Sequence, residues 1–341
     1  MKSDNNRIRP TIREVAAVSG TSIKTVSRVL NGVPTVDPVL VQKVNKAIKQ
    51  LNYRPNVTAG NLRRVDGRTN TIGLLLKDIA NPFSSALHRA IENLAREEGL
   101  DVLAGSLDEQ PDRERELIST LITRRVDGLI IVPTSSDHAY LQKERSAGMP
   151  IVFIDRPPNN FIADTVVVTN RLSAEQATQH LINHGHTRIA YLGDDQRIFT
   201  ASERFSGYKS ALHKAKIKLD LSLVHHGREG FDDVDHFIQA IFNSKNTPTA
   251  IFASQNFVTI TAIRALKSHG LEKKIALVGF DELPFADLLD PGISLVTQDI
   301  STMANIASNL LFARMHGKKT KAEFHEIPTI FTARGSGEIR N

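Results

Sequence analysis

The sequence predicts a multidomain protein: an N-terminal, all-α helix-turn-helix headpiece followed by an α/β core of two doubly wound, parallel-sheet subdomains. Three observations support this fold class. Three short amphipathic helical patterns fill the first 50 residues, and from residue 70 short apolar runs alternate with amphipathic helices. About 270 residues follow that point, which is long for a single sheet and indicates two subdomains.

Composition places the chain among ordinary globular proteins. Of its 341 residues, 40% are apolar and 23% are charged. It has no apolar run of about 18 residues that would span a membrane, and its first residues lack the apolar segment of a secretory signal. The chain has no cysteine, which excludes disulfides and thiolate metal sites. We therefore expect a soluble cytoplasmic protein without a cofactor or a metal.

Charge is distributed unevenly along the chain. Residues 1–70 contain 13 Lys and Arg against four Asp and Glu, so their net charge is +9. The net charge of the whole chain is +6, so the remaining residues carry a net charge of −3. A basic segment on an acidic body indicates that this segment meets a polyanion. The alternative of a solvated, charged tail is disfavoured, because the segment also has ordered helical periodicity.

The first two helices are marked by their caps. Thr11 precedes "IREVAAVSG" with Glu14 three residues later, which is the pattern of a capping box, and Gly20 ends that helix. Ser22 caps a second helix that runs to about Asn31. Two short helices joined by a tight turn form a helix-turn-helix.

The third helix begins at Asp37-Pro38, an N-cap acid followed by a proline at the first helical position. The apolar residues of "VLVQKVNKAIKQL" then keep the helical period as far as Leu51. After "NYRP", residues 56–69 are polar, basic and contain glycine, which is typical of a linker or a marginal helix. The apolar positions assigned to the headpiece core are Val15, Val18, Val26 and Val29.

The core region alternates apolar runs with amphipathic helices. Buried strands that alternate with helices are typical of parallel sheets covered on both faces. The predicted strands are "TIGLLL", "DVLAGS", "GLIIVP", "PIVFID", "TVVVTN", "RIAYLG", "AIFAS" and "IALVGF". Examples of the helices are "PFSSALHRAIENLAREEG", "ERELISTLITRRV", "SAEQATQHLINHG" and "FVTITAIRALKSHG".

Several of these segments, in their order, resemble the LacI/GalR (lac-repressor type) family of bacterial transcriptional regulators. The resemblance rests on "TIREVAAVSGTSIKTVSRVLNG", "KVNKAIKQLNYRPN", "TIGLLLKDIANPF", "RRVDGLIIVP", "GHTRIAYLG", "ERFSGYKSAL", "PTAIFAS" and "VGFDEL", which cover nearly the whole chain. It implies a DNA-binding headpiece, a hinge helix, a periplasmic-binding-protein-like effector core and a homodimer. The divisions it implies are a headpiece at 1–55, a hinge at 56–69 and a core at 70–341. Within the core, the N-subdomain is expected at about 70–168 and 300–327, and the C-subdomain at about 169–299 and 328–341.

The second helix, "TSIKTVSRVLN", directs basic, hydroxyl and amide groups outward and has no acid. Such a helix suits the major groove, where base edges and phosphates present hydrogen-bonding groups and an acid would be repelled. The resemblance implies that Ile23 and Lys24 read bases, with Arg28 one turn later. Lys and Arg can bond guanine, whereas Ile offers an apolar contact such as to a thymine methyl. Residues expected to hold phosphates are Thr11, Ser22, Thr25, Ser27 and Asn31; Tyr53 is also expected to contact DNA.

The hinge has its own expected mechanism. In the family this segment forms a helix on the operator, and a leucine from each chain of the dimer enters the minor groove. The matching residue is Leu62, and an inserted apolar side chain kinks the duplex. Gly60 departs from a good helix and costs up to about 1 kcal/mol relative to alanine. The other hinge residues expected to face DNA or the partner chain are Asn56, Thr58 and Ala59.

The core is expected to bind a small effector between its subdomains, outside the carboxyl ends of the strands. The resemblance places Asn81 and Phe83 after the first strand, Asp155 at the end of "PIVFID", Arg204 in "ERFSGY" and Asp281 in "VGFDEL". An Arg and two Asp can form bidentate, charge-assisted bonds with vicinal hydroxyls.

One position in the cleft departs from many relatives. In "ASQN", Gln255 and Asn256 replace an amide and an acid, and Gln255 is the expected ligand contact. Loss of that carboxylate weakens the case for a plain neutral sugar and leaves three classes of effector open: a sugar, a sugar phosphate or a nucleoside. Whether the effector releases DNA or promotes binding is also open.

The function predicted is a sequence-specific DNA-binding regulator, most simply a repressor, that binds a palindromic operator as a dimer. The alternative is a cytoplasmic small-molecule sensor that keeps the fold without binding an operator. A third hypothesis is a sugar-modifying enzyme. The sequence shows none of the HExxH, GxSxG or P-loop motifs, so no catalytic residue is predicted. No leucine heptad follows the core, which favours a dimer over a tetramer.

Overall fold

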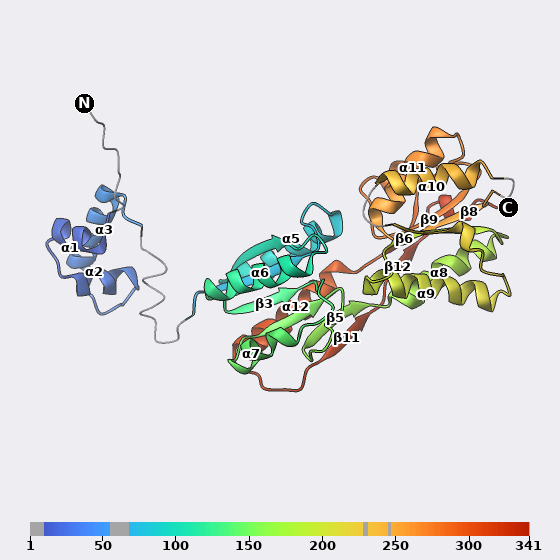
Figure 1. The fold of residues 1–341 in the computed structure, drawn as a ribbon. Helices are drawn as coiled ribbons and strands as arrows, with labels where there is room; N and C mark the ends of the chain where they lie inside the picture. Colours follow the sequence, from blue (N-terminus) through green and yellow to red (C-terminus); the bar gives the residue numbers. More distant parts are fainter. Residues whose placement is uncertain (1–9, 55–67, 228–230, 245–246, 341) are drawn as a thin grey trace, which may run out of the picture. The chain divides into compact units, whose positions relative to one another are not determined.

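The computed structural model describes residues 10–54, 68–227, 231–244 and 247–340. The chain divides into two compact units, Met1–Thr69 and Asn70–Asn341 (Figure 1). The predicted fold class is confirmed, with three helices in the described part of the headpiece and a core of two mainly parallel sheets.

The headpiece helices form where their caps predict. They are α1 (Ile12–Ser19), α2 (Ile23–Leu30) and α3 (Pro38–Leu51). Thr11 and Glu14 complete a capping box, and Gly20 ends α1 in the left-handed conformation. The core of the headpiece is made of Val15, Ala16, Val26, Val44, Ala47 and Tyr53, with less buried apolar residues around it.

The assignment of Val18 to this core was wrong. Its side chain is 46% exposed, while Val15, Ala16 and Ser19 are the buried residues of α1. A helix of only eight residues presents one narrow stripe to its neighbours, and Val18 lies outside that stripe.

The first sheet of the core has the strand order β11-β5-β4-β3-β1-β2, and all its pairings are parallel. Its strands are β1 (Thr71–Leu76), β2 (Asp101–Ser106), β3 (Gly128–Ile131), β4 (Ile151–Ile154), β5 (Asp164–Val168) and β11 (Phe324–Ile327). One face is covered by α5 (Pro82–Glu97) and α12 (Ile300–Met315). The other is covered by α6 (Pro111–Thr123), with η1 (Ala139–Leu141) and α7 (Gln142–Ser146) beyond it.

The second sheet has the order β12-β10-β9-β8-β6-β7. Its strands are β6 (Ile189–Asp194), β7 (Val224–Gly227), β8 (Ala250–Ala253), β9 (Ala276–Phe280), β10 (Ser294–Thr297) and β12 (Ile330–Thr332). Figure 1 shows α8 (Asn170–Asn183) and α9 (Phe199–Lys214) side by side on one face, and α10 (Phe231–Phe242) and α11 (Asn256–Ser268) together on the other. Short 3₁₀ turns complete this half: η2 (Leu221–Leu223), η3 (Ala286–Leu288) and η4 (Ser336–Glu338).

The chain crosses between the two sheets three times: after β5, after β10 and after β11. The last crossing explains the one antiparallel pairing among the described strands. Only two residues separate β11 from β12, so the chain leaves the first sheet and enters the second at their facing ends, and β12 must run antiparallel to β10. The three crossings bring the carboxyl ends of both sheets to one cleft.

Candidate functional site

Helix α2 presents a polar surface on the headpiece. Ser22 caps it, since its Oγ accepts a hydrogen bond from the backbone N–H of Thr25 at 3.1 Å. Val26 is fully buried against the headpiece core, which turns the opposite side of the helix outward. Ile23 is 42% exposed, and Lys24 is exposed beside it. The remaining predicted contacts on α2 and its cap are Ser22, Arg28 and Asn31, which are exposed, and Thr25 and Ser27, which are half-buried.

Arg28 and Thr11, like Ser22, already bind other protein groups. Nη2 of Arg28 donates to Oγ1 of Thr35 at 2.6 Å, which ties the loop after α2 to the helix. Oγ1 of Thr11 donates to Oε2 of Glu14 at 2.9 Å. Hydrogen bonds from the backbone and side chain of Thr11 lower the pKa of Glu14, so a phosphate at this helix end competes with a carboxylate for the same donors.

Tyr53 differs from the other predicted contacts because it is only 9% exposed and packs in the headpiece core. The four predicted hinge contacts, Asn56, Thr58, Ala59 and Leu62, lie outside the described residues. The described headpiece residues nevertheless carry a clear excess of positive charge. Residues 10–54 carry seven Lys and Arg against two acids, and all nine side chains are exposed.

Two aspartates occupy equivalent places in the two sheets of the core. Asp155 follows β4 and Asp281 follows β9, and their φ angles are 71° and 73°. Each backbone N–H donates to the neighbouring strand, to Val166 O at 2.9 Å and to Val296 O at 2.8 Å. Asp is one of the few side chains that tolerate this left-handed conformation. Both are buried, with 7% exposure.

Arg204 is held firmly beside Asp281. Its Nε donates to Oδ1 of Asn170 at 2.8 Å and its Nη1 donates to the carbonyl of Ser254 at 2.7 Å. The guanidinium lies over the ring of Phe280, 3.6 Å from the centroid, and Nη1 is 3.8 Å from Oδ2 of Asp281. An arginine that is 5% exposed and bonded on several sides is preorganised.

A second charged cluster surrounds Asp155. Burial raises the pKa of Asp155, and the charges of Arg156 and Arg204 oppose that rise. Both terminal nitrogens of Arg156 donate to Glu109, at 2.9 and 2.6 Å. Lys77 lies between Glu109, at 3.5 Å, and Asp194 of the second sheet, at 3.6 Å.

Sequence reasoning missed Lys77, Glu109, Arg156 and Asp194, although each lies at or just beyond a strand end. The available signal was their position after an apolar run, a position that they share with Asp155, which the family resemblance selected. The pairing of these four side chains depends on which loops meet, which the sequence does not display.

An amide pair joins the two subdomains. Asn81, the N-cap of α5, donates from Nδ2 to Oδ1 of Asn256 at 3.0 Å, and Asn256 donates back to Oδ1 of Asn81 at 2.9 Å. The two side chains are 6% and 0% exposed. Asn81 therefore binds the opposite subdomain in this structure. Phe83 packs partly buried against the core under α5.

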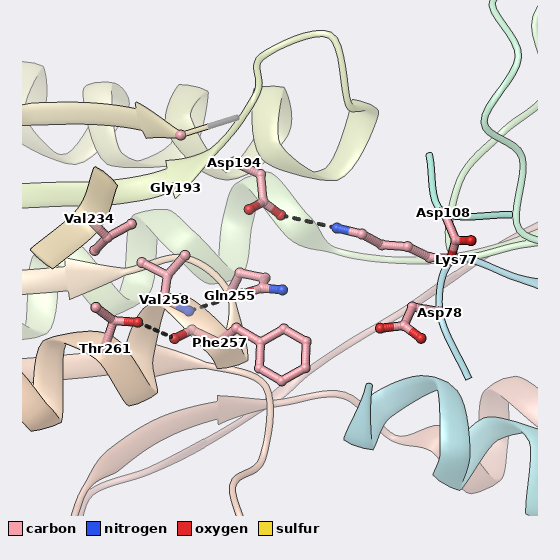
Figure 2. A pocket seen from close by; sticks show the side chains of 11 residues that line it. Lys77, Asp78, Asp108, Gly193, Asp194, Val234, Gln255, Phe257, Val258 and Thr261 are labelled. Atoms are coloured by element: carbon pink, nitrogen blue, oxygen red, sulfur yellow. Dashed lines mark hydrogen bonds and ion pairs between the residues drawn. The ribbon is translucent and has the colours of Figure 1, made fainter. Parts of the chain in front are cut away.

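The open volume of the cleft lies next to these residues. A cavity of about 270 Å³ is lined on one side by Lys77, Asp78 and Asp108. The lining residues from the second subdomain are Gly193, Asp194, Gly227, Val234, Gln255, Phe257, Val258 and Thr261 (Figure 2). Of the predicted effector contacts, only Gln255 lines this cavity; Asn81, Phe83, Asp155, Arg204 and Asp281 do not. The aromatic ring at the cavity is Phe257 instead of Phe83.

A basic helix-turn-helix unit and a two-sheet core with a ligand-sized cleft together define a ligand-responsive, DNA-binding regulator. The family model for "Bacterial regulatory proteins, lacI family" matches residues 11–56, and that for "Periplasmic binding proteins and sugar binding domain of LacI family" matches residues 69–325. The chain belongs to the lacI family of bacterial regulatory proteins, whose members are transcriptional regulators that act on DNA in the cytoplasm.

Named relatives cover the chain almost completely. It is 32% identical to the ribose operon repressor of Halalkalibacterium halodurans over 95% of this chain and 96% of the relative. Among solved structures, the transcriptional regulator CelR in complex with cellobiose is 28% identical, with a TM-score of 0.69 and coverage of 96% of this chain and 100% of that one. The lac repressor dimer bound to operator and an anti-inducer shares the fold with a TM-score of 0.83 at 23% identity, covering 97% and 99%.

The described residues include neither a membrane-spanning helix nor a cluster of metal ligands. In the described ranges, no helix is both long and apolar enough to cross a membrane. Within the same part of the chain, no group of three or more His, Asp or Glu side chains is arranged to hold a metal ion.

Proposed function

We propose that the protein is a repressor that binds a palindromic operator as a homodimer and changes its operator affinity when a small sugar-like molecule enters the cleft. The surface of α2 carries this proposal. It combines an exposed Lys24 and Arg28 with hydroxyl and amide groups, and it has no acid. Protein two-fold symmetry then requires two half-sites related by the same symmetry.

The proposed division of labour on DNA follows the chemistry of each side chain. Ile23 and Lys24 read base edges, and Arg28 adds a guanine or phosphate contact one turn later. Phosphate contacts come from Thr11, Ser22, Thr25, Ser27 and Asn31, with Tyr53 supporting the headpiece from within. The hinge, 56–69, adds Asn56, Thr58, Ala59 and Leu62 at the minor groove. This assignment divides the chain into 1–55, 56–69 and 70–341, and divides the core at its three crossings.

The proposed effector site is the cleft. Gln255 contacts the ligand in the cavity, while Arg204, Asp281 and Asp155 form the charged wall next to it. The Asn81–Asn256 pair holds the cleft closed, with Phe83 supporting the start of α5. A ligand that binds one conformation of the cleft more tightly than another shifts the equilibrium between these conformations. The change reaches the headpieces through the segments that join them to the cores. The cleft residues are used for binding, and we propose no catalytic activity.

Selection of duplexes from a random-sequence pool by the full-length protein tests this function. The expected product is an inverted repeat whose binding weakens steeply with salt, because phosphate contacts release counterions. Failure to retain any duplex at low salt would favour the alternative, a small-molecule sensor that does not bind an operator.

Light scattering is expected to give two chains, and four would contradict the dimer. Recovery of chemically altered sugar after long incubation would favour an enzyme.

A further inference from the structure

The basic side chains at the cleft are already bonded to protein oxygens. Lys77, the one cation among the described residues that line the cavity, lies between Glu109 and Asp194. Arg156 directs both terminal nitrogens at Glu109, and Arg204 is held by Asn170 and the Ser254 carbonyl. An anionic ligand would have to displace one of these acceptors to gain a cation.

The helix end at the cavity is also occupied. Phosphates bind helix N-termini through unpaired backbone N–H groups. Helix α11 begins at the cavity, but Oδ1 of Asn256 accepts from Phe257 N at 2.8 Å and Oε1 of Gln255 accepts from Val258 N at 3.0 Å. These two side chains take the N–H groups that a phosphate would use.

The charged lining is acidic. Against Lys77 stand Asp78, Asp108 and Asp194, so these described residues contribute a net −2. A phosphate monoester therefore meets like charge at this cavity, with low-dielectric protein around it.

The same groups suit hydroxyls. Carboxylate oxygens accept charge-assisted hydrogen bonds, and Nε2 of Gln255 remains a donor after Oε1 has capped α11. Figure 2 shows the ring of Phe257 beside Gln255, with Asp78 across the same space. A sugar ring has one apolar face, which can pack on Phe257, and several hydroxyls, which can bond Gln255 and Asp78. The volume of about 270 Å³ lies just below the ~300 Å³ lower end of pockets for drug-sized ligands.

We propose that the effector is an uncharged polyhydroxyl molecule of monosaccharide size, and that the cleft discriminates against its phosphorylated forms. This inference rests on the proposed effector site. Of the three effector classes that the sequence leaves open, a sugar, a sugar phosphate or a nucleoside, it selects the sugar.

A thermal-shift series on the full-length protein tests the inference with matched pairs. The probes are the neutral aldopentoses and aldohexoses, D-ribose and D-glucose among them, each beside its own terminal phosphate ester. A ligand that binds the native state raises the melting temperature by mass action. At least one neutral sugar is expected to raise it, and its phosphate ester is expected to bind at least about tenfold more weakly. A phosphate ester that binds as tightly as its parent sugar or more so, or no shift with any neutral sugar, overturns the inference.

A charge variant adds a second measurement. Asp78→Asn keeps the acceptor that caps Ala80 N at 2.8 Å but removes one negative charge from the cavity. Its affinity for the neutral sugar is expected to fall about tenfold, and the preference for sugar over phosphate is expected to shrink. Glu92→Gln, an exposed α5 carboxylate paired with Arg89 and absent from the cavity lining, is the matched control. An unchanged preference in Asp78→Asn would contradict the role of the acidic lining.

Operator binding by the same preparations separates this inference from the proposed function. If a phosphate ester binds and alters operator affinity, the regulator remains and only the ligand class is wrong. If a sugar binds in the cleft but no ligand alters operator affinity, the proposed regulation fails while the ligand class stands.

Discussion

Single residues at strand ends form the cleft, and the sequence predicts some of them and misses others. Asp155 and Asp281 are predicted from the family resemblance, and both directly follow buried strands and lie at the cleft in the left-handed conformation. The same reasoning proposed Phe83 as the aromatic contact, whereas Phe257 lines the cavity. Phe83 and Phe257 lie at the starts of two similar helices, α5 and α11. Which of these two side chains faces the core depends on how its helix packs.

Lys24 provides the sharpest residue-scale prediction on DNA. Lys24→Ala is expected to weaken binding to the selected operator by about tenfold or more, and to relax the preference at one position of each half-site if Lys24 bonds a guanine. Anisotropy titrations with the operator and with single-base variants measure this. Lys319→Ala, an exposed lysine of the core, is the matched control. Equal losses in both variants would show that Lys24 supplies general charge alone.

Glu114 provides a residue-scale prediction on stability. This carboxylate is fully buried; burial would raise its pKa, but hydrogen bonds from His138, the Thr134 backbone and Tyr140 hold the pKa at about 2. Because the folded pKa lies below the unfolded value, the stabilisation is present above about pH 4.5 and is lost as the pH falls toward 2.

The variant Glu114→Gln is expected to lower the free energy of unfolding by about 3 kcal/mol at pH 7, with a smaller difference below pH 4.5. Urea unfolding followed by circular dichroism at several pH values measures the difference. Glu116→Gln, an exposed carboxylate on the same helix, is the control. A pH-independent difference would mean that the charge of Glu114 contributes nothing.

At the scale of elements, local signals mark some segments and not others. The starts of α1, α2 and α3 follow from their caps, because capping is set by residues within one turn. β7, β11 and β12 carry no long apolar run, since they are short edge strands whose side chains, except that of Ile327, are exposed or half-buried. The antiparallel direction of β12 follows from the crossing geometry, which no local pattern records.

The contact between α5 and α11 yields an element-scale prediction. Asn81 and Asn256 each cap a helix and bond each other across the cleft. Removing either amide leaves the other buried without its partner, so Asn81→Ala and Asn256→Ala are each expected to cost about 1–3 kcal/mol. The double variant is expected to cost less than the sum.

A double-mutant cycle on urea unfolding measures this coupling. Ligand affinity measured alongside is expected to change in both single variants, because the pair favours one closure of the cleft. Strictly additive losses in stability would show that the pair does not act as a unit.

The whole molecule separates two tasks that the charge distribution along the sequence already indicates. The basic headpiece carries the nucleic-acid surface, and the acidic core carries the cleft. The sequence predicts this organisation well, because apolar periodicity, caps and charge are local properties. It predicts the ion pairs of Lys77 and Arg156 poorly, because their partners come from separate loops.

Linkage supplies a prediction at this scale. If the sugar changes operator affinity by some factor, the operator must change sugar affinity by the same factor. Titrating sugar into the protein with and without saturating operator, and operator with and without saturating sugar, measures both factors. Unequal factors would show that the two ligands are not linked through one equilibrium of this protein.

The most direct test of the account is operator affinity of the full-length protein measured across a salt series, with and without the sugar found in the thermal-shift panel. The account predicts a linear fall of the logarithm of the association constant with the logarithm of salt concentration, a shallower slope in Lys24→Ala if that lysine contacts a phosphate, and a shifted curve when the sugar is present. Affinity that is independent of salt, or unchanged by any ligand of the cleft, would contradict it.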